Sequence, residues 1–290
     1  MDIKKLRVSG WITLALAAAA LEPILVKFGY RDALAPAQLI VLKNLTAAVI
    51  MLPLLGKVKA VGLAGFRQMI LPGILLFTTS FMVFLSLQYL QVVLVITIVT
   101  TTPALVALVN CRLGRESADG KFWAGLFLCF AGVVLTLDYR DIAVNYLGVI
   151  CACISALSST FYRVKMEELT TAYSPVVCSF CTFFLQAILT LFLLPFVGAV
   201  PAQACALGLW LGLSAAIGNI AFLCALNIVG STRISILTML QRPLIIVLAA
   251  VSLKETINAM QLLGIVLVML GVHLAQVRRV AEIKNSGLPC

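Results

Sequence analysis

Ten long apolar segments follow one another along the 290-residue chain, separated by short polar connections. Each segment approaches the roughly 20 apolar residues that an α-helix needs to cross the hydrocarbon core of a bilayer. The predicted spans cover residues 9–29, 36–55, 68–88, 91–111, 121–137, 145–164, 175–196, 206–227, 233–252 and 258–277. The pattern therefore predicts an all-α integral membrane protein with ten transmembrane helices and no soluble domain between them.

The composition agrees with this pattern. Hydrophobic residues make up 62% of the chain and charged residues 11%, whereas soluble domains carry about 25% charged residues. Such a chain could stay in water only by exposing most of its apolar surface. The first span follows a short basic segment, as a signal peptide would. It nevertheless carries Glu22 and Lys27 and has no clear cleavage site, so we expect it to be retained.

Lysine and arginine residues gather on one side of the predicted spans. With the N-terminus in the cytoplasm, the cytoplasmic side receives fourteen: Lys4, Lys5, Arg7, Lys57, Lys59, Arg67, Arg112, Arg115, Lys121, Arg163, Lys165, Arg278, Arg279 and Lys284. The outer side receives three: Arg31, Arg140 and Lys254. This asymmetry predicts a cytoplasmic (inner) membrane protein with both termini in the cytoplasm. It also accounts for the net charge of +10 without a nucleic-acid partner.

The two halves of the chain resemble each other. Three pairs lie 139 residues apart: Glu116 and Glu255, Gly125 and Gly264, and Gly132 and Gly271. Because each half holds an odd number of spans, five, the second copy would be inverted relative to the first. We predict a first repeat over residues 1–138, an inverted repeat over 139–280 and a short cytoplasmic tail over 281–290. Inverted repeats are typical of secondary transporters, which bind their substrates at the repeat interface.

The doubled pattern resembles the EamA family of ten-helix carriers in the drug/metabolite transporter superfamily. The resemblance depends on the segments SLQYL and ALNIV, the spans with Pro103 and Pro243 that follow them, Glu116 and Glu255, and two Gly-rich closing helices. It covers essentially the whole chain. It implies two inverted five-helix repeats around a central cavity, and alternating access. Family members move amino acids, nucleotide-like metabolites, sugars or drugs, many of them as exporters.

Two charged residues lie at a similar depth inside neighbouring predicted spans. Glu22 and Lys43 are each about seven residues from the outer end of their span, roughly 10 Å below the outer face at 1.5 Å per residue. Unpaired charges at this depth are costly, so an ion pair is expected. The pair has two interpretations: a structural pair, or a group that binds substrate or exchanges a proton. The resemblance fits a cation at position 43, where many family members have an arginine.

The ninth predicted span carries an unusual polar interruption. Gln241, Arg242 and Pro243 lie near the middle of the apolar segment Ile234–Val251. An arginine near the bilayer centre costs about 3 kcal/mol or more unless it faces a wet cavity or a partner. We therefore interpret Gln241 and Arg242 as substrate-binding residues. The alternative is a structural bridge from Arg242 to Glu22, or to carbonyls that the proline frees. Family members usually have an apolar residue before this proline.

Further polar residues fall at comparable depth in other spans. We select Thr101, Tyr162 and Asn219 as candidates for binding substrate. Most polar residues in membrane helices serve packing, so only part of any such set is expected to face a substrate. Arg163 and Lys165 are interpreted instead as anchors that reach the cytoplasmic interface from the end of the sixth span.

Nothing in the sequence indicates catalysis or a cofactor. It contains no Walker A segment, no H-E-x-x-H and no G-x-S-x-G. Cys178 and Cys181 form a C-x-x-C without a second pair, so small packing residues are favoured over a redox or zinc site. His273 is the single histidine, and a hydrogen-bonded or interfacial role is favoured over a proton relay. We expect a protein that is not an enzyme and that holds neither cofactor nor metal.

The predicted function is secondary transport, and by analogy with the family export, of a small carboxylate-bearing or amino-acid-like metabolite. The positive charges of Lys43 and Arg242 outnumber the negative charge of Glu22, so the cavity would have a net positive charge. Such a cavity suits a substrate with a carboxylate or phosphate. The expected partners are a small-molecule substrate and the lipid bilayer, with a proton as a candidate coupling ion. The open alternatives are export of a drug, a nucleotide-like metabolite or a metal-chelating molecule, a membrane-embedded enzyme, and a structural subunit without transport. The sequence does not determine the oligomeric state.

Overall fold

The computed structural model describes residues 3–58, 62–90, 95, 98–117, 119–135, 145–198, 201, 204–241, 244, 259–275 and 278–279. Within these ranges the chain is almost entirely helical. Five segments are long and apolar enough to cross a membrane: Ser9–Arg31, Pro36–Leu54, Ala64–Tyr89, Tyr146–Ala172 and Ala204–Val229. Shorter apolar helices cover Gly120–Leu135, Pro175–Leu191 and Leu262–Leu274. The prediction of a helical membrane protein is confirmed to this extent.

The helices and strands occur in the following order. They are α1 (Ile3–Arg31), α2 (Pro36–Met51), η1 (Leu52–Leu54), α3 (Leu55–Val58), α4 (Gly62–Tyr89), α6 (Thr102–Arg112), β1 (Glu116–Ser117), α7 (Gly120–Leu135), α8 (Tyr146–Ala172), α9 (Pro175–Leu191), η2 (Leu194–Phe196), α10 (Ala204–Val229), α11 (Ser231–Leu237), η3 (Thr238–Leu240), α13 (Ala259–Leu274) and β2 (Arg278–Arg279).

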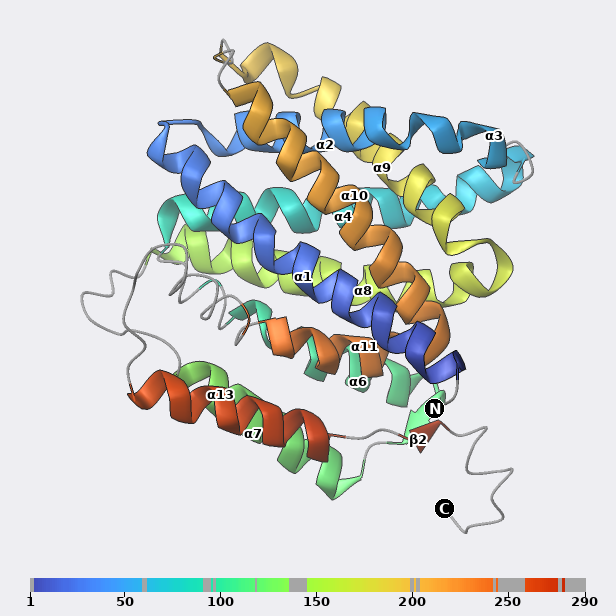
Figure 1. Ribbon diagram of the computed structural model, residues 1–290, viewed down its shortest axis with the longest axis vertical. Coiled ribbons are helices and arrows are strands. Elements are labelled where there is room, and N and C mark those ends of the chain that lie inside the picture. The colour runs from blue at the N-terminus through green and yellow to red at the C-terminus, as the bar shows by residue number, and fades with distance from the viewer. Residues whose placement is uncertain are drawn as a thin grey trace.

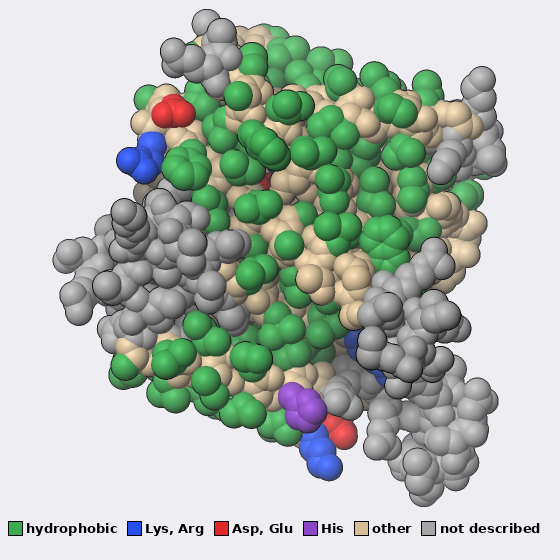
Figure 2. All heavy atoms as spheres, in the orientation of Figure 1, with side chains coloured by type: hydrophobic (Ala, Val, Ile, Leu, Met, Phe, Trp, Pro, Cys, Tyr) green, Lys and Arg blue, Asp and Glu red, His purple; other side chains and the backbone are tan. Residues whose placement is uncertain are grey.

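The surface is that of a protein surrounded by lipid. Figure 2 shows hydrophobic side chains over much of the described part of one face, where charged side chains are visible in only a few small places. Large apolar side chains such as Phe127 and Phe192 are each 72% exposed. Water would not stabilise so large an apolar surface, whereas the bilayer interior does.

Several helix ends follow from local sequence. Pro36 and Pro175 begin α2 and α9, where the missing backbone N–H removes no intrahelical bond. Asn145 caps α8, because its side-chain oxygen accepts a hydrogen bond from the Leu147 backbone N–H at 2.9 Å. Gly230 separates α10 from α11 with a φ of 88°, a conformation that favours glycine. This glycine lets the chain turn directly from one helix into the next.

The long helices pack in pairs that are distant in sequence (Figure 1). Helix α1 lies along α10, α4 lies along α8, and α2 contacts both α9 and α10. Helices α7 and α13 form a separate pair, with α6 and α11 between that pair and the rest of the helices. Most polar side chains considered below come from the larger group, which contains α1, α2, α4, α8, α9 and α10.

Glycines allow the close approach of α7 and α13. A Cβ on Gly132 would lie 2.7 Å from the Gly264 carbonyl oxygen, and one on Gly271 would lie 2.7 Å from the Gly125 carbonyl oxygen. A side chain at these positions would force the backbones apart, as in other small-residue membrane interfaces. Gly132 of α7 therefore meets Gly264 of α13, and Gly125 of α7 meets Gly271 of α13.

Helices α1 and α4 each begin six residues before their predicted spans, and two further differences are more marked. Helix α8 runs to Ala172, eight residues beyond the predicted end at residue 164, because Met166, Leu169 and Thr170 continue its buried face. In addition, β1 and β2 form a two-residue antiparallel pair that joins the loop after α6 to the segment after α13. An all-helical prediction did not include this pair. The second half of the ninth predicted span lies mostly outside the described residues.

Candidate functional site

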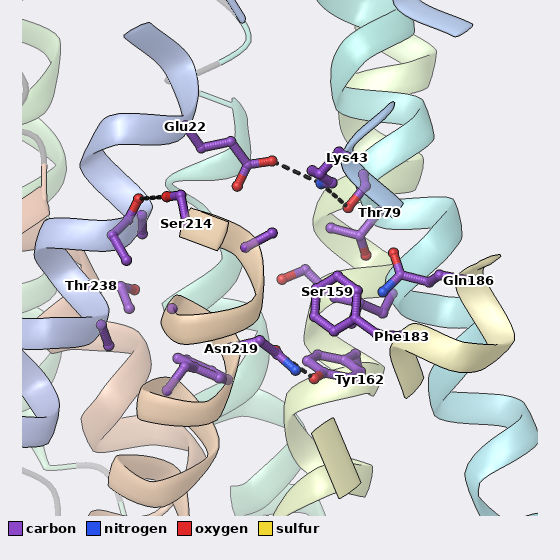
Figure 3. A pocket seen from close by; sticks show the side chains of 18 of the residues that line it. Glu22, Lys43, Thr79, Ser159, Tyr162, Phe183, Gln186, Ser214, Asn219 and Thr238 are labelled. Carbon is purple, nitrogen blue, oxygen red and sulfur yellow. Dashed lines mark hydrogen bonds and ion pairs between the residues drawn. The ribbon is translucent and has the colours of Figure 1, made fainter. Parts of the chain in front are cut away.

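A cavity of about 230 Å³ lies among α1, α2, α4, α8, α9 and α10. Figure 3 shows polar side chains entering it from several helices. Its polar and charged lining residues are Glu22, Lys43, Thr79, Ser80, Ser159, Tyr162, Arg163, Gln186, Ser214, Asn219, Thr238 and Gln241. Polar groups in membrane helices commonly face the interior of a bundle or a water-filled cavity, so this cavity is the candidate functional site.

Glu22 and Lys43 form an ion pair at the wall of the cavity. The Lys43 Nζ donates to Glu22 Oε1 at 2.8 Å and to Ser80 Oγ at 3.1 Å, and it lies 5.1 Å from the centre of the Phe84 ring. The Lys43 side chain is 4% exposed, whereas that of Glu22 is 29% exposed. Lys43 is therefore well satisfied inside the protein, and Glu22 presents the more accessible end of the pair.

Gln241 compensates for a proline on a different helix. Pro23 has no backbone N–H, so within α1 the carbonyl of Ala19 loses the donor four residues later. The Gln241 Nε2 donates to this carbonyl at 2.6 Å. The next carbonyl toward the N-terminus, that of Ala18, accepts a bond from Ser214 Oγ at 2.7 Å. Gln241 thus lines the cavity, but its amide nitrogen is used to join two parts of the protein.

Arg163 also lines the cavity, so the interpretation of this residue as a cytoplasmic anchor was wrong. Helix α8 extends beyond it, and the guanidinium turns inward. Its Nε donates to Ser159 Oγ at 3.3 Å, and its Nη1 donates to Ser235 Oγ at 3.1 Å and to Thr238 Oγ1 at 3.4 Å. The guanidinium carbon lies 5.0 Å from the centre of the Phe222 ring, within cation–π range.

The Arg163 guanidinium has no counter-ion in the part of the chain that the structure describes. Its neighbours there are hydroxyl groups and an aromatic ring, and its Nη2 makes no hydrogen bond to them. The described lining residues with charged side chains are Glu22, Lys43 and Arg163, and the first two neutralise each other. The described lining therefore carries one excess positive charge, centred on Arg163.

Tyr162 and Asn219 belong to a hydrogen-bonded chain beside this cation. The Tyr162 hydroxyl donates to Asn219 Oδ1 at 3.1 Å, and Asn219 Nδ2 donates to Ser179 Oγ at 2.9 Å. Tyr162 is almost fully buried. This series of hydrogen bonds joins α8, α10 and α9. It holds Tyr162 and Asn219 in one orientation at the cavity wall (Figure 3).

Gln186, unlike Tyr162 and Asn219, makes no side-chain hydrogen bond to the described part of the protein. Its side chain is 0% exposed, and neither amide atom has a hydrogen-bond partner among the described residues. A buried, unsatisfied polar group costs about 1–3 kcal/mol. Gln186 was not selected from the sequence, although a glutamine in the middle of the apolar segment Pro175–Leu191 was the available signal.

Of the two remaining selected residues, the structure describes only Thr101. Thr101 does not line this cavity but a separate, mostly apolar hollow that includes Trp123 and Phe127. Its hydroxyl donates to the backbone carbonyl of Ile98 at 2.7 Å, a common use of threonine in membrane helices. Arg242 lies outside the described residues. The cavity thus brings together five of the seven selected residues.

The described residues contain no group of three or more His, Cys, Asp and Glu side chains that could hold a metal ion. The cavity polar groups are hydroxyls, amides, one carboxylate and two cations. Groups of this kind can form hydrogen bonds and charge-assisted bonds with a solute.

Comparison with known proteins agrees with these features. The sequence profile described as the EamA-like transporter family matches residues 7–138 and again residues 146–276. A protein described as an uncharacterized transporter of Synechocystis sp. is 25% identical over 224 residues, which are 74% of this chain and 68% of the relative. One crystal structure, described only as that of a protein, has a TM-score of 0.75 and 21% sequence identity. That similarity covers 93% of this chain and 96% of the other, and it supports the fold alone.

Proposed function

The chain belongs to the EamA-like transporter family, and we propose that it transports a small carboxylate-bearing or amino-acid-like metabolite through the cavity between its helices. Family membership makes it a multi-pass membrane transporter of small molecules. The family does not determine the substrate, so the choice of a carboxylate depends on the charged groups in the cavity.

Arg163 is the observation that carries the proposal. It lines the cavity, it lacks a carboxylate partner among the described residues, and its Nη2 is unused there. Serine and threonine hydroxyls hold Nε and Nη1, which orients the guanidinium and leaves Nη2 to donate without neutralising its charge. A guanidinium in this situation binds a carboxylate through short, charge-assisted hydrogen bonds.

The other selected residues have supporting roles in this proposal. Glu22 is the accessible member of the pair with Lys43, and it is positioned to bind the ammonium group of an amino-acid-like substrate or to exchange a proton. Asn219 and Tyr162 shape the wall next to Arg163. Arg242 follows Gln241 in the sequence and lies outside the described residues, so it stays a sequence-based candidate for binding substrate. Thr101 has no part in the proposed site, because it lies on a different hollow.

We propose that two inverted five-helix repeats, residues 1–138 and 139–280, move relative to each other to expose this site alternately to the two sides. The glycine contacts between α7 and α13 support a repeat interface. Near the C-terminal end of α8, Glu167 accepts a bond from the Ser231 backbone N–H at 3.0 Å. Asn110 donates to Ser231 Oγ at 2.8 Å, and we propose that this network closes one side of the cavity.

The cellular setting of the proposal comes from the sequence. The distribution of lysine and arginine favours a cytoplasmic membrane with both termini in the cytoplasm. Removing Arg163 from the cytoplasmic count leaves thirteen basic residues against three, so the predicted orientation does not depend on it. Export is the direction favoured by family analogy, with a proton as the candidate coupling ion.

A binding screen followed by transport tests the proposal. Purified protein is screened for thermal stabilisation by small metabolites, each carboxylate paired with its neutral primary amide, because a ligand raises the apparent stability by mass action. The best carboxylate is then measured in proteoliposomes. Arg163→Gln should weaken its apparent affinity by about 30-fold or more, the equivalent of about 2 kcal/mol. Arg163→Lys should retain part of the affinity.

Arg67→Gln provides the matched control, because Arg67 is an exposed arginine on α4 outside the cavity. It should transport as wild type does. Equal stabilisation by carboxylates and their amides, or unchanged transport by Arg163→Gln, would contradict the proposal.

A further inference from the structure

Gln186 enters the cavity from α9, on the side opposite Thr238 (Figure 3). It is fully buried, and in the described part of the chain no donor faces its amide oxygen and no acceptor faces its amide nitrogen. Polar groups buried in a membrane protein are expected to be hydrogen-bonded, because lipid offers no replacement for water. Gln186 therefore has unused hydrogen-bonding capacity next to the cavity.

The other two amides that line the cavity are used within the protein. Asn219 accepts from Tyr162 and donates to Ser179, and Gln241 donates to the carbonyl of Ala19. These bonds connect helices and explain why both amides are there. Gln186 makes no such connection, so a structural explanation of the same kind is not available for it.

We propose that Gln186 selects substrates that carry, besides a carboxylate, a neutral hydrogen-bonding group such as a carboxamide or a hydroxyl. This inference rests on the proposed function, in which Arg163 binds the carboxylate. Arg163 is hydrogen-bonded to Thr238, across the cavity from Gln186, so a ligand held by its carboxylate extends toward α9. An amide donates and accepts at once, so it pairs with a carboxamide through two hydrogen bonds and with a hydroxyl through one.

Selectivity follows from the cost of leaving this amide unpaired. A ligand with an apolar group at that end fills the cavity but provides no partner for Gln186. Sites built to hydrogen-bond a substrate group reject analogues that lack the group far more strongly than apolar pockets reject analogues that differ by a methylene. Gln186 would therefore act on the choice of substrate rather than on carboxylate binding itself.

Two probes of the same shape test this role. Succinamate and 4-methylpentanoate share a carboxylate and chain length, but one ends in a carboxamide and the other in an isopropyl group. Their affinities are obtained from the unfolding temperature of the purified full-length protein over a concentration series. We expect wild type to bind succinamate at least about tenfold more tightly than 4-methylpentanoate. Gln186→Met should bring the ratio of the two affinities close to one.

The variants separate this inference from the proposed function. Gln186→Met removes two unpaired polar atoms, so its unfolding temperature without ligand should equal or exceed that of wild type. Gln68→Met, at an exposed glutamine on α4, should retain the wild-type ratio. Suppose that both probes bind wild type. The role of Gln186 is refuted if wild type binds them with an affinity ratio near one, or if Gln186→Met has the same affinity ratio as wild type. Carboxylate binding stands in either case. If neither probe binds wild type, the role of Gln186 is refuted, whereas carboxylate binding is judged by the stabilisation screen and by Arg163→Gln.

Discussion

The ion pair of Glu22 and Lys43 gives a quantitative test of how the cavity is held together. The two charged atoms are 2.8 Å apart, which corresponds to an attraction of about 6 kcal/mol at an effective dielectric constant of about 20. Desolvation offsets much of this, chiefly at Lys43, which is 4% exposed. The contacts of Lys43 with Ser80 and Phe84 remain when Glu22 is removed. We therefore expect the two residues to be coupled by about 2 kcal/mol.

The perturbations are Glu22→Met, Lys43→Met and the double variant, measured by denaturant unfolding in mixed micelles with helical circular dichroism as the signal. Glu22→Met should be the more harmful single change, at about 3 kcal/mol, because it leaves a buried ammonium without a counter-ion. Lys43→Met should cost about 2 kcal/mol, since water still reaches part of the carboxylate. The double variant should lose about 3 kcal/mol, well below the sum of the single effects. Additivity of the two single effects to within about 0.5 kcal/mol would refute the reasoning.

Three further outcomes follow from single contacts. Gly132→Ile should reduce the folded yield in detergent, because its Cβ would lie 2.7 Å from the Gly264 carbonyl oxygen. Size-exclusion chromatography measures this yield. Gly120→Ile is the control, because the space around its Cβ is open. Gln241→Leu should lower the free energy of unfolding by about 1–3 kcal/mol, since the bond to the carbonyl freed by Pro23 is lost; an unchanged value would contradict that role. Tyr162→Phe should cost about 1 kcal/mol by the same measurement, with a null effect counting against the hydrogen bond to α10.

Much of the fold could be predicted from the sequence because hydrophobic length is the main constraint on a membrane helix. The described helices fall within the predicted spans or extend them, and the depth argument correctly brought Glu22 and Lys43 together. The expectation that the two spans pack side by side was wrong, because α1 and α2 each lie against α10, and the two charged side chains meet at the cavity between the helices. The glycine pairs at constant spacing reappear as a contact between α7 and α13.

The error at Arg163 has a physical cause. Hydropathy falls after Tyr162, where Lys165, Glu167 and Glu168 follow, so mean hydropathy predicts too early an end of the span and an interfacial arginine. Those polar residues remain helical because Glu168 pairs with Lys165 at 2.6 Å, while the opposite face stays buried. Periodicity of the buried face would have been a better guide than mean hydropathy. Gln186 was missed because a single amide does not change the hydropathy of its span.

The most direct test of carboxylate binding is a structure of the protein with the strongest carboxylate from the stabilisation screen bound. The account predicts a carboxylate oxygen within hydrogen-bonding distance of the Arg163 guanidinium, with Ser235 and Thr238 still supporting its other side. A carboxylate bound elsewhere, with Arg163 contacting only the protein, would contradict it.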